Sequence, residues 1–142
     1  MSSYQQMKAD HRAEISAFPM FFAFDEKQFY EGMSKLGLAP DDTDKICKLG
    51  SMGGFLRKSD ASSLREMFDR HEKELADAIA ADQTGDGFTF DMFMYELGNH
   101  EYTYTGDTSD TLDALGFSED DMERNPALRH GLEKACEAQW AC

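Results

Sequence analysis

The chain has 142 residues, of which 41% are apolar, so it is long and apolar enough to bury one core. Its 28 acidic and 14 basic residues give a formal net charge of −14, which disfavours direct binding to nucleic acid or to an anionic membrane. Length and composition together predict one folded domain that spans residues 1–142.

Helical periodicity dominates the chain and predicts a mainly α-helical fold, in which one layer of helices packs on another. The expected helices, in chain order, run from Tyr4 to near Pro19, over 25–38 and 40–50, from Ser59 or Asp60 to about Ala81, over 91–97, 109–115 and 119–123, and from Pro126 onward. The glycine-rich stretch at 50–54 predicts a turn after the third of these helices.

Two short segments indicate strands rather than helices. The sequence "EYTYT" at 101–105 alternates polar and aromatic residues, and "FLRK" follows the glycine-rich turn. We expect these segments to pair as a small two-stranded sheet, about 54–58 with 101–105. An α+β fold therefore stays open beside the mainly α one.

The three cysteines predict free thiols. Their number is odd, and no C-x-x-C motif occurs. Neither a full disulfide set nor a structural zinc site can therefore be built from Cys47, Cys136 and Cys142. The first 16 residues contain no apolar run, and no apolar stretch of 18 residues occurs. These features predict a cytoplasmic protein without a membrane span.

The stretch "DQTGDGFTFDMF" resembles a calcium loop of the EF-hand type. Asp82, Thr84, Asp86 and Gly87 occupy the right positions, but the twelfth position holds Phe93 where a bidentate glutamate is needed. The alternative is a plain helix–turn–helix connection. In that connection the two glycines of the loop take positive φ values and Asp86 braces the turn.

Three strings match motifs of two-metal phosphoesterases. They are "DRH" at 69–71, "GNHE" at 98–101 and "GDTSD" at 106–110. Their order is wrong for that family, the late histidine motif is missing, and "DRH" falls in a predicted helix. We therefore predict no metal and no cofactor.

A smaller histidine site remains as an alternative. His71, Glu72, His100 and Glu101 could meet as an acid–base or single-metal site. His71, however, lies on the apolar stripe of its helix, where a histidine more often packs at the edge of a core than acts as a ligand. Whether His71 and His100 are neighbours cannot be read from the sequence.

Acidic residues are concentrated in two clusters that are candidate partner-binding sites. The first cluster contains Asp107, Asp110, Asp113, Glu119, Asp120, Asp121 and Glu123, and the second contains Asp41, Asp42 and Asp44. Carboxylates on a rigid helical frame can imitate backbone phosphates and steer association with a basic protein. The competing interpretation is a solvated surface that only keeps the protein soluble.

Four blocks of sequence carry a resemblance to a known family. They are "FFAFDEKQFYEGMSKLGL", "GSMGGFLRKSD", "FDRHEKEL" and "YELGNHEYTYTGDTSDTLDALGFS". Together, over roughly residues 20–118, they resemble small acidic proteins of bacteria and their phages. The resemblance implies an intracellular setting and a phage or mobile element as source. It implies no activity and carries no catalytic residue to this chain.

Three functions are compatible with these features. The first is an inhibitor that binds a basic, nucleic-acid-handling host enzyme, as anti-CRISPR or anti-restriction proteins do. Such an inhibitor could act as a mimic of nucleic acid. The second is an enzyme that uses the histidine and glutamate residues named above. The third is a structural accessory protein with a merely solubilising acidic surface. The sequence indicates neither the partner's identity nor an oligomeric state.

Overall fold

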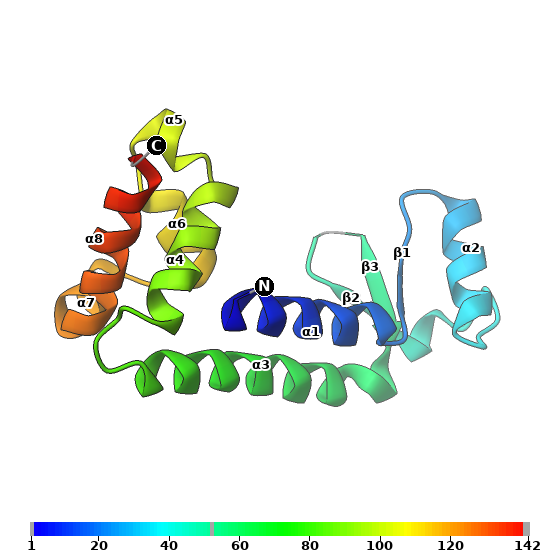
Figure 1. Cartoon of the computed structure of the whole chain (residues 1–142). Coiled ribbons are helices and arrows are strands. Elements are labelled where there is room, and N and C mark those ends of the chain that lie inside the picture. Colours follow the sequence, from blue (N-terminus) through cyan, green and yellow to red (C-terminus); the bar gives the residue numbers. More distant parts are fainter. Residues whose placement is uncertain (1, 52, 141–142) are drawn as a thin grey trace. The chain divides into compact units, whose positions relative to one another are not determined.

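The computed structural model describes residues 2–51 and 53–140, which fold into two compact units (Figure 1). Unit 1 consists of residues 1–11 and 73–142, and unit 2 consists of residues 12–72. Helices predominate and one small antiparallel sheet is present, so the prediction of a mainly α fold is confirmed.

Helices occur along the whole described chain, and the three short strands all lie before α3. The helices are α1 (Ser3–Ala17), α2 (Glu26–Lys35), α3 (Ala61–Ala81), α4 (Phe88–Asn99), α5 (Tyr102–Thr105), α6 (Ser109–Leu115), α7 (Glu119–Arg124) and α8 (Pro126–Trp140). The strands are β1 (Met20–Phe22), β2 (Ile46–Leu49) and β3 (Gly54–Arg57), and 3-10 turns lie at Thr43–Lys45 and Lys58–Asp60.

Unit 1 is built around the packing of α4 on α8 (Figure 1). The sequence of α4, "FTFDMFMYELGN", is apolar on most of its surface, and Met92, Phe93 and Leu97 are fully buried. The Gln139 side chain donates a 3.0 Å hydrogen bond to the Met94 carbonyl and so ties the end of α8 to α4. The shorter helices α5, α6 and α7 surround this pair.

Unit 2 is built around the sheet, whose strand order is β1-β3-β2. Phe21 of β1 lies opposite Phe55 of β3, and their rings stack at 5.3 Å. Met33 of α2 and Leu36, which follows the helix, belong to the same core cluster as Phe21, and Phe55 packs against this cluster. Gly32 allows the close approach, because a Cβ atom there would lie 2.0 Å from the Phe21 ring.

The predicted pairing of 54–58 with 101–105 is wrong. Strand β3 pairs with β1 and β2, while 102–105 forms the single helical turn α5. Gly106, at a φ of +67°, ends this turn with a hydrogen bond from its N–H to the Tyr102 carbonyl. Five alternating residues fit one helical turn as well as a short strand, so the pattern alone could not distinguish them.

The predicted helix over 40–50 is also wrong. Only the 3-10 turn at 43–45 forms there, and Ile46 to Leu49 pair with β3 instead. The turn between β2 and β3 was predicted from its glycines, and Gly50 and Gly53 indeed have positive φ values. Residues 46–49 therefore form a strand, because hydrogen bonding to β3 across this turn outweighs their weak preference for a helix.

Candidate functional site

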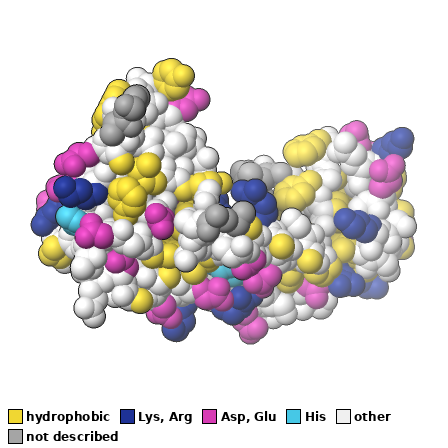
Figure 2. Space-filling view, viewed as in Figure 1, with side chains coloured by type: hydrophobic (Ala, Val, Ile, Leu, Met, Phe, Trp, Pro, Cys, Tyr) yellow, Lys and Arg dark blue, Asp and Glu magenta, His cyan; other side chains and the backbone are white. Residues whose placement is uncertain are grey.

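The first acidic cluster lies on and around α6 and α7 in unit 1. All seven of its carboxylate side chains are exposed, and acidic side chains are visible at the surface of unit 1 (Figure 2). The opposite side of each helix is anchored, because Thr111 of α6 and Met122 of α7 are buried. The two short helices therefore present their carboxylates outward from a packed core.

Two members of this cluster stabilise the ends of the helices that carry it. Asp107 accepts a 2.8 Å hydrogen bond from the Ser109 N–H, which lowers the pKa of its carboxyl group. Asp121 and Ser118 exchange side-chain and backbone hydrogen bonds in a capping box, and the bond from the Ser118 N–H lowers the pKa of Asp121. These two carboxylates fix local structure in addition to adding charge.

The other five carboxylates of this cluster have little local role. Asp120 lies 3.9 Å from Arg124, and both side chains are largely exposed. Within residues 2–51 and 53–140, no hydrogen bond or ion pair involves the remaining four side chains, which are Asp110, Asp113, Glu119 and Glu123. Such carboxylates can pair with an external cation without first breaking an internal contact.

The second acidic cluster belongs to unit 2 and is more committed to local structure. Asp42 accepts a 2.9 Å hydrogen bond from the Ala39 N–H and lies 3.5 Å from the Lys45 ammonium group. The backbone bond is the main cause of the lowered pKa of Asp42. Asp41 and Asp44 are exposed beside it.

The net charge is divided very unequally between the two units. Unit 1 has 17 acidic and 5 basic residues, hence a formal charge of −12, whereas unit 2 has 11 acidic and 9 basic residues, hence −2. Nearly all of the net charge that the sequence shows therefore belongs to unit 1.

His71 is a buried residue of α3, with 8% of its surface exposed. Its Nε2 atom lies 3.4 Å from the Glu14 carboxylate, which also pairs with Arg70. The Arg70 hydrogen bond is the largest cause of the lowered pKa of Glu14. In unit 2 this cluster joins α1 to α3, as the 2.8 Å contact between His11 and Glu74 does in unit 1.

His100 and Glu101 occupy the junction between α4 and α5 in unit 1. The Nδ1 atom of His100 lies 2.8 Å from the Glu96 carbonyl at the end of α4, and Glu101 has a φ of +55°. His71 and Glu72 belong to unit 2. Among the described residues, no three His, Cys, Asp or Glu side chains are grouped so that they could hold a metal ion.

A buried polar cluster in unit 1 was not predicted from the sequence. The Lys8 Nζ atom lies 2.6 Å from the Glu96 carboxylate, whose side chain is 4% exposed, and Asn99 donates to the same oxygen at 3.1 Å. Lys8 also lies over the Tyr95 ring, 5.1 Å from its centroid. The sequence signal for it is a glutamate inside the largely apolar helix α4. The cluster fixes the start of α1 against α4.

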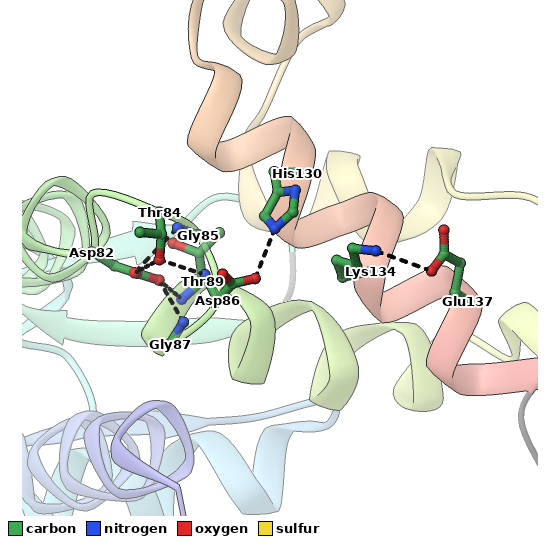
Figure 3. Close-up of polar contacts among 9 residues, drawn as sticks. All are labelled: Asp82, Thr84, Gly85, Asp86, Gly87, Thr89, His130, Lys134 and Glu137. Atoms are coloured by element: carbon green, nitrogen blue, oxygen red, sulfur yellow. Dashed lines mark hydrogen bonds and ion pairs between the residues drawn. The ribbon is translucent and has the colours of Figure 1, made fainter.

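The loop between α3 and α4 is organised by Asp82 rather than by Asp86 (Figure 3). The Asp82 carboxylate accepts hydrogen bonds from the N–H groups of Gly85, Gly87 and Thr89, at 3.2, 3.1 and 2.9 Å. Burial opposes ionisation of Asp82, but these bonds together lower its pKa. The prediction that Asp86 braces the turn is wrong.

Asp86 instead reaches outward from the loop to α8. Its carboxylate lies 2.7 Å from the Nε2 atom of His130 (Figure 3). Of the two glycines predicted to need positive φ, Gly85 has a φ of +84° and Gly87 has −100°. The position that would carry a calcium-binding glutamate holds Phe93, which is fully buried in the core.

Fold and surface together define a small, mainly α-helical protein whose first unit presents an acidic exterior. A family described as a family of unknown function (DUF7659) matches residues 3–138, and the chain belongs to this family. This agrees with the predicted resemblance to a family without an assigned activity. No curated protein and no solved structure matches the chain. Within the described residues, no helix is both long and apolar enough to cross a membrane.

Proposed function

We propose that this protein acts by binding, and that the acidic exterior of unit 1 docks on a basic surface of a protein that handles nucleic acid. The observation that carries the proposal is the charge of −12 on unit 1, with exposed carboxylates on α6 and α7. By covering the partner's basic surface, the protein would compete with nucleic acid. An anti-CRISPR or anti-restriction protein encoded by a phage or mobile element would act in this way.

The physical basis of the proposal is electrostatic complementarity. A surface that binds nucleic acid carries Lys and Arg side chains that neutralise phosphates. Exposed carboxylates at helical spacing offer the same partners to those side chains, and a high net charge accelerates the encounter. Because surface charges are screened within about 8 Å at physiological salt, the binding should weaken as salt is added.

The framework of α6 and α7 suits this role because it is held in place from beneath and at its ends. Thr111 and Met122 are buried, and the Ser118–Asp121 capping box fixes the start of α7. A carboxylate on a fixed helix loses less conformational entropy on binding than one on a mobile loop. The charges are thus presented in a largely pre-formed arrangement.

The proposal is tested by affinity capture of the tagged protein from bacterial lysate, with washes at low and high salt. We expect a basic nucleic-acid-handling enzyme to be retained at low salt and weakened at high salt. Purified target would then be titrated with nucleic acid and with this protein, and the two should compete. If nothing specific is retained at either salt, the acidic exterior only solubilises the protein and the proposal fails.

A matched pair of variants tests whether unit 1 carries the binding. The test variant combines Asp113→Asn, Glu119→Gln and Glu123→Gln. It leaves Asp107 and Asp121, because both accept backbone hydrogen bonds at the starts of helices. The control combines Asp69→Asn, Glu66→Gln and Glu72→Gln, which removes the same number of exposed charges from unit 2.

We expect the test variant to lose about tenfold or more in affinity for the captured partner, and the control to lose about threefold or less. The reason is that only the test variant alters the charges proposed to face the partner. Equal losses in both variants would show that total charge, rather than the α6–α7 surface, determines binding.

A further inference from the structure

A groove of about 610 Å³ runs along β1 in unit 2. All three residues of β1 line it, which places the groove along the strand itself. The facing wall is one side of α2, because Gln28, Glu31, Gly32 and Lys35 follow the i, i+3, i+4, i+7 spacing of a single helical face. Ile15 and Ser16 near the end of α1 line it as well, so the groove is bordered by β1, by one face of α2 and by the end of α1.

The β1 edge has properties that favour pairing with another strand. In the order β1-β3-β2, β1 has a neighbouring strand on one side only, so its other backbone edge has no strand partner within the described residues. The strand reads "MFF" and contains no charged residue. Natural edge strands are blunted by charge, by shortness or by a covering element. At three residues β1 is short and offers few backbone groups, but no charge on the strand opposes the addition of another strand.

Large apolar side chains are exposed next to this edge. Phe22 lines the groove and is 54% exposed, and Phe24, two residues further along the chain, is 80% exposed. Hydrophobic side chains are visible at the surface of unit 2 (Figure 2). Unit 2 itself has a formal charge of only −2, so its own residues bring little like charge to a contact with a second copy of unit 2.

The α2 wall of the groove carries one acidic and one basic residue, so two copies of this wall can be complementary to each other. Glu31 and Lys35 both line the groove, one acidic and one basic, a helical turn apart. Their spacing would permit an ion pair within α2, yet none is formed between them in the part of the chain described. In a two-fold interface each residue meets its counterpart reciprocally, so Glu31 of one copy can face Lys35 of the other.

We infer that the partner of this groove is a second copy of the chain, and that the two β1 edges pair antiparallel about a two-fold axis. The two sheets then continue into one another. The α2 helices lie side by side on the same face of the joined sheet, and Glu31 and Lys35 form two reciprocal ion pairs. The exposed Phe22 side chains are covered at the junction.

The test measures self-association of the full chain by sedimentation velocity from about 10 to about 300 µM, at moderate salt. We expect the wild type to be a dimer over the upper part of this range. Glu31→Lys alone and Lys35→Glu alone each place like charges opposite one another twice, so each should weaken the dimer about tenfold or more. The double reversal restores opposite charges and should return the dissociation constant to within about threefold of the wild type.

Two further results decide the matter. Phe22→Glu should give a monomer whose far-ultraviolet circular dichroism matches that of the wild type. Lys48→Glu, on the other edge strand β2, is the control and should leave the dimer unchanged. A wild type that is monomeric at about 300 µM overturns the inference, as does a double reversal that fails to recover association.

Discussion

Lys8 and Glu96 form an ion pair that holds the start of α1 against α4, with 2.6 Å between the Nζ atom and the nearer carboxylate oxygen. Glu96 has almost no contact with water, whereas Lys8 is about one-third exposed. We expect Lys8→Met to lower the free energy of unfolding by about 2–3 kcal/mol, because it leaves a buried carboxylate without its cation. Urea denaturation of the two proteins measures this difference.

Lys73→Met is the matched control for this substitution. Lys73 pairs with Asp77 at 2.7 Å, but both side chains are largely exposed. An exposed pair contributes little, so the control should change the free energy of unfolding by about 0.5 kcal/mol or less. Equal effects of the two substitutions would show that the burial of Glu96 does not matter to the pair.

Tyr4 provides a pH-dependent prediction at the same site. Its burial, and then the neighbouring Glu96 carboxylate, raise the pKa of the phenol above its usual range. The unfolded chain therefore loses this proton near pH 10 while the folded chain keeps it, so the folded state loses stability as pH rises above about 10. Tyr4→Phe should show a shallower fall of the unfolding free energy between about pH 9.5 and 11 than the wild type, in matched urea titrations.

At the scale of elements, the loop between α3 and α4 meets α8 through two glycines. A Cβ atom on Gly85 would lie 2.0 Å from the Ala127 carbonyl oxygen, and one on Gly131 would lie 2.9 Å from the Gly85 carbonyl oxygen. Gly85 also has a φ of +84°. Gly85→Ala therefore combines an unfavourable backbone conformation with a backbone clash, and we expect it to cost about 3 kcal/mol or more.

Gly106→Ala separates these two causes. Gly106 has a φ of +67°, but nothing lies within 4 Å of the position its Cβ would take. Alanine at this position should cost only about 1 kcal/mol, the usual penalty for the left-handed conformation. Thermal unfolding of both variants measures the difference, and a cost at Gly85 no larger than that at Gly106 would contradict close packing of the loop on α8.

Sequence patterns predicted the helices well where apolar periodicity is long and the ends are marked. The last helix was expected from Pro126 and forms as α8, and α6 agrees with its expected range of 109–115. Of the three short strands, β3 was predicted at about 54–58, whereas β1 and β2 were not, because they form only through pairing with β3. The helix predicted over 40–50 was wrong for the same reason, since residues 46–49 pair with β3.

The candidate surfaces were predictable only in part. Exposure of the seven acids around α6 and α7 follows from their spacing opposite apolar residues such as Met122. The hydrogen bonds that Asp107 and Asp121 accept at the starts of α6 and α7 depend on local backbone geometry. The contact of Lys8 with Glu96 joins residues 88 positions apart, and no local pattern signals such a pair. The same holds for the β1 groove, because it depends on how α2 packs on the sheet.

At the scale of the whole molecule, the net charge of −14 has a cost in stability. Like charges on unit 1 repel one another in the folded state, and added salt screens this repulsion. We expect the midpoint of thermal unfolding to rise between about 10 mM and 500 mM sodium chloride. The variant with Asp113→Asn, Glu119→Gln and Glu123→Gln should rise less and start at least as high as the wild type. A drop with salt would contradict a repulsive role for these acids.

Trp140, the single tryptophan of the chain, ends α8 beside Tyr102, with 5.9 Å between the ring centroids. Its indole is 56% exposed, so its emission and its quenching by acrylamide respond to the local packing of unit 1, whereas unit 2 contains no tryptophan. The protein thus carries an intrinsic optical label on one unit only. Fluorescence follows the melting of that unit, while circular dichroism follows every helix. Coincident transitions by the two probes would identify the whole chain as one cooperative folding unit, and separated transitions would assign each unit its own melting temperature.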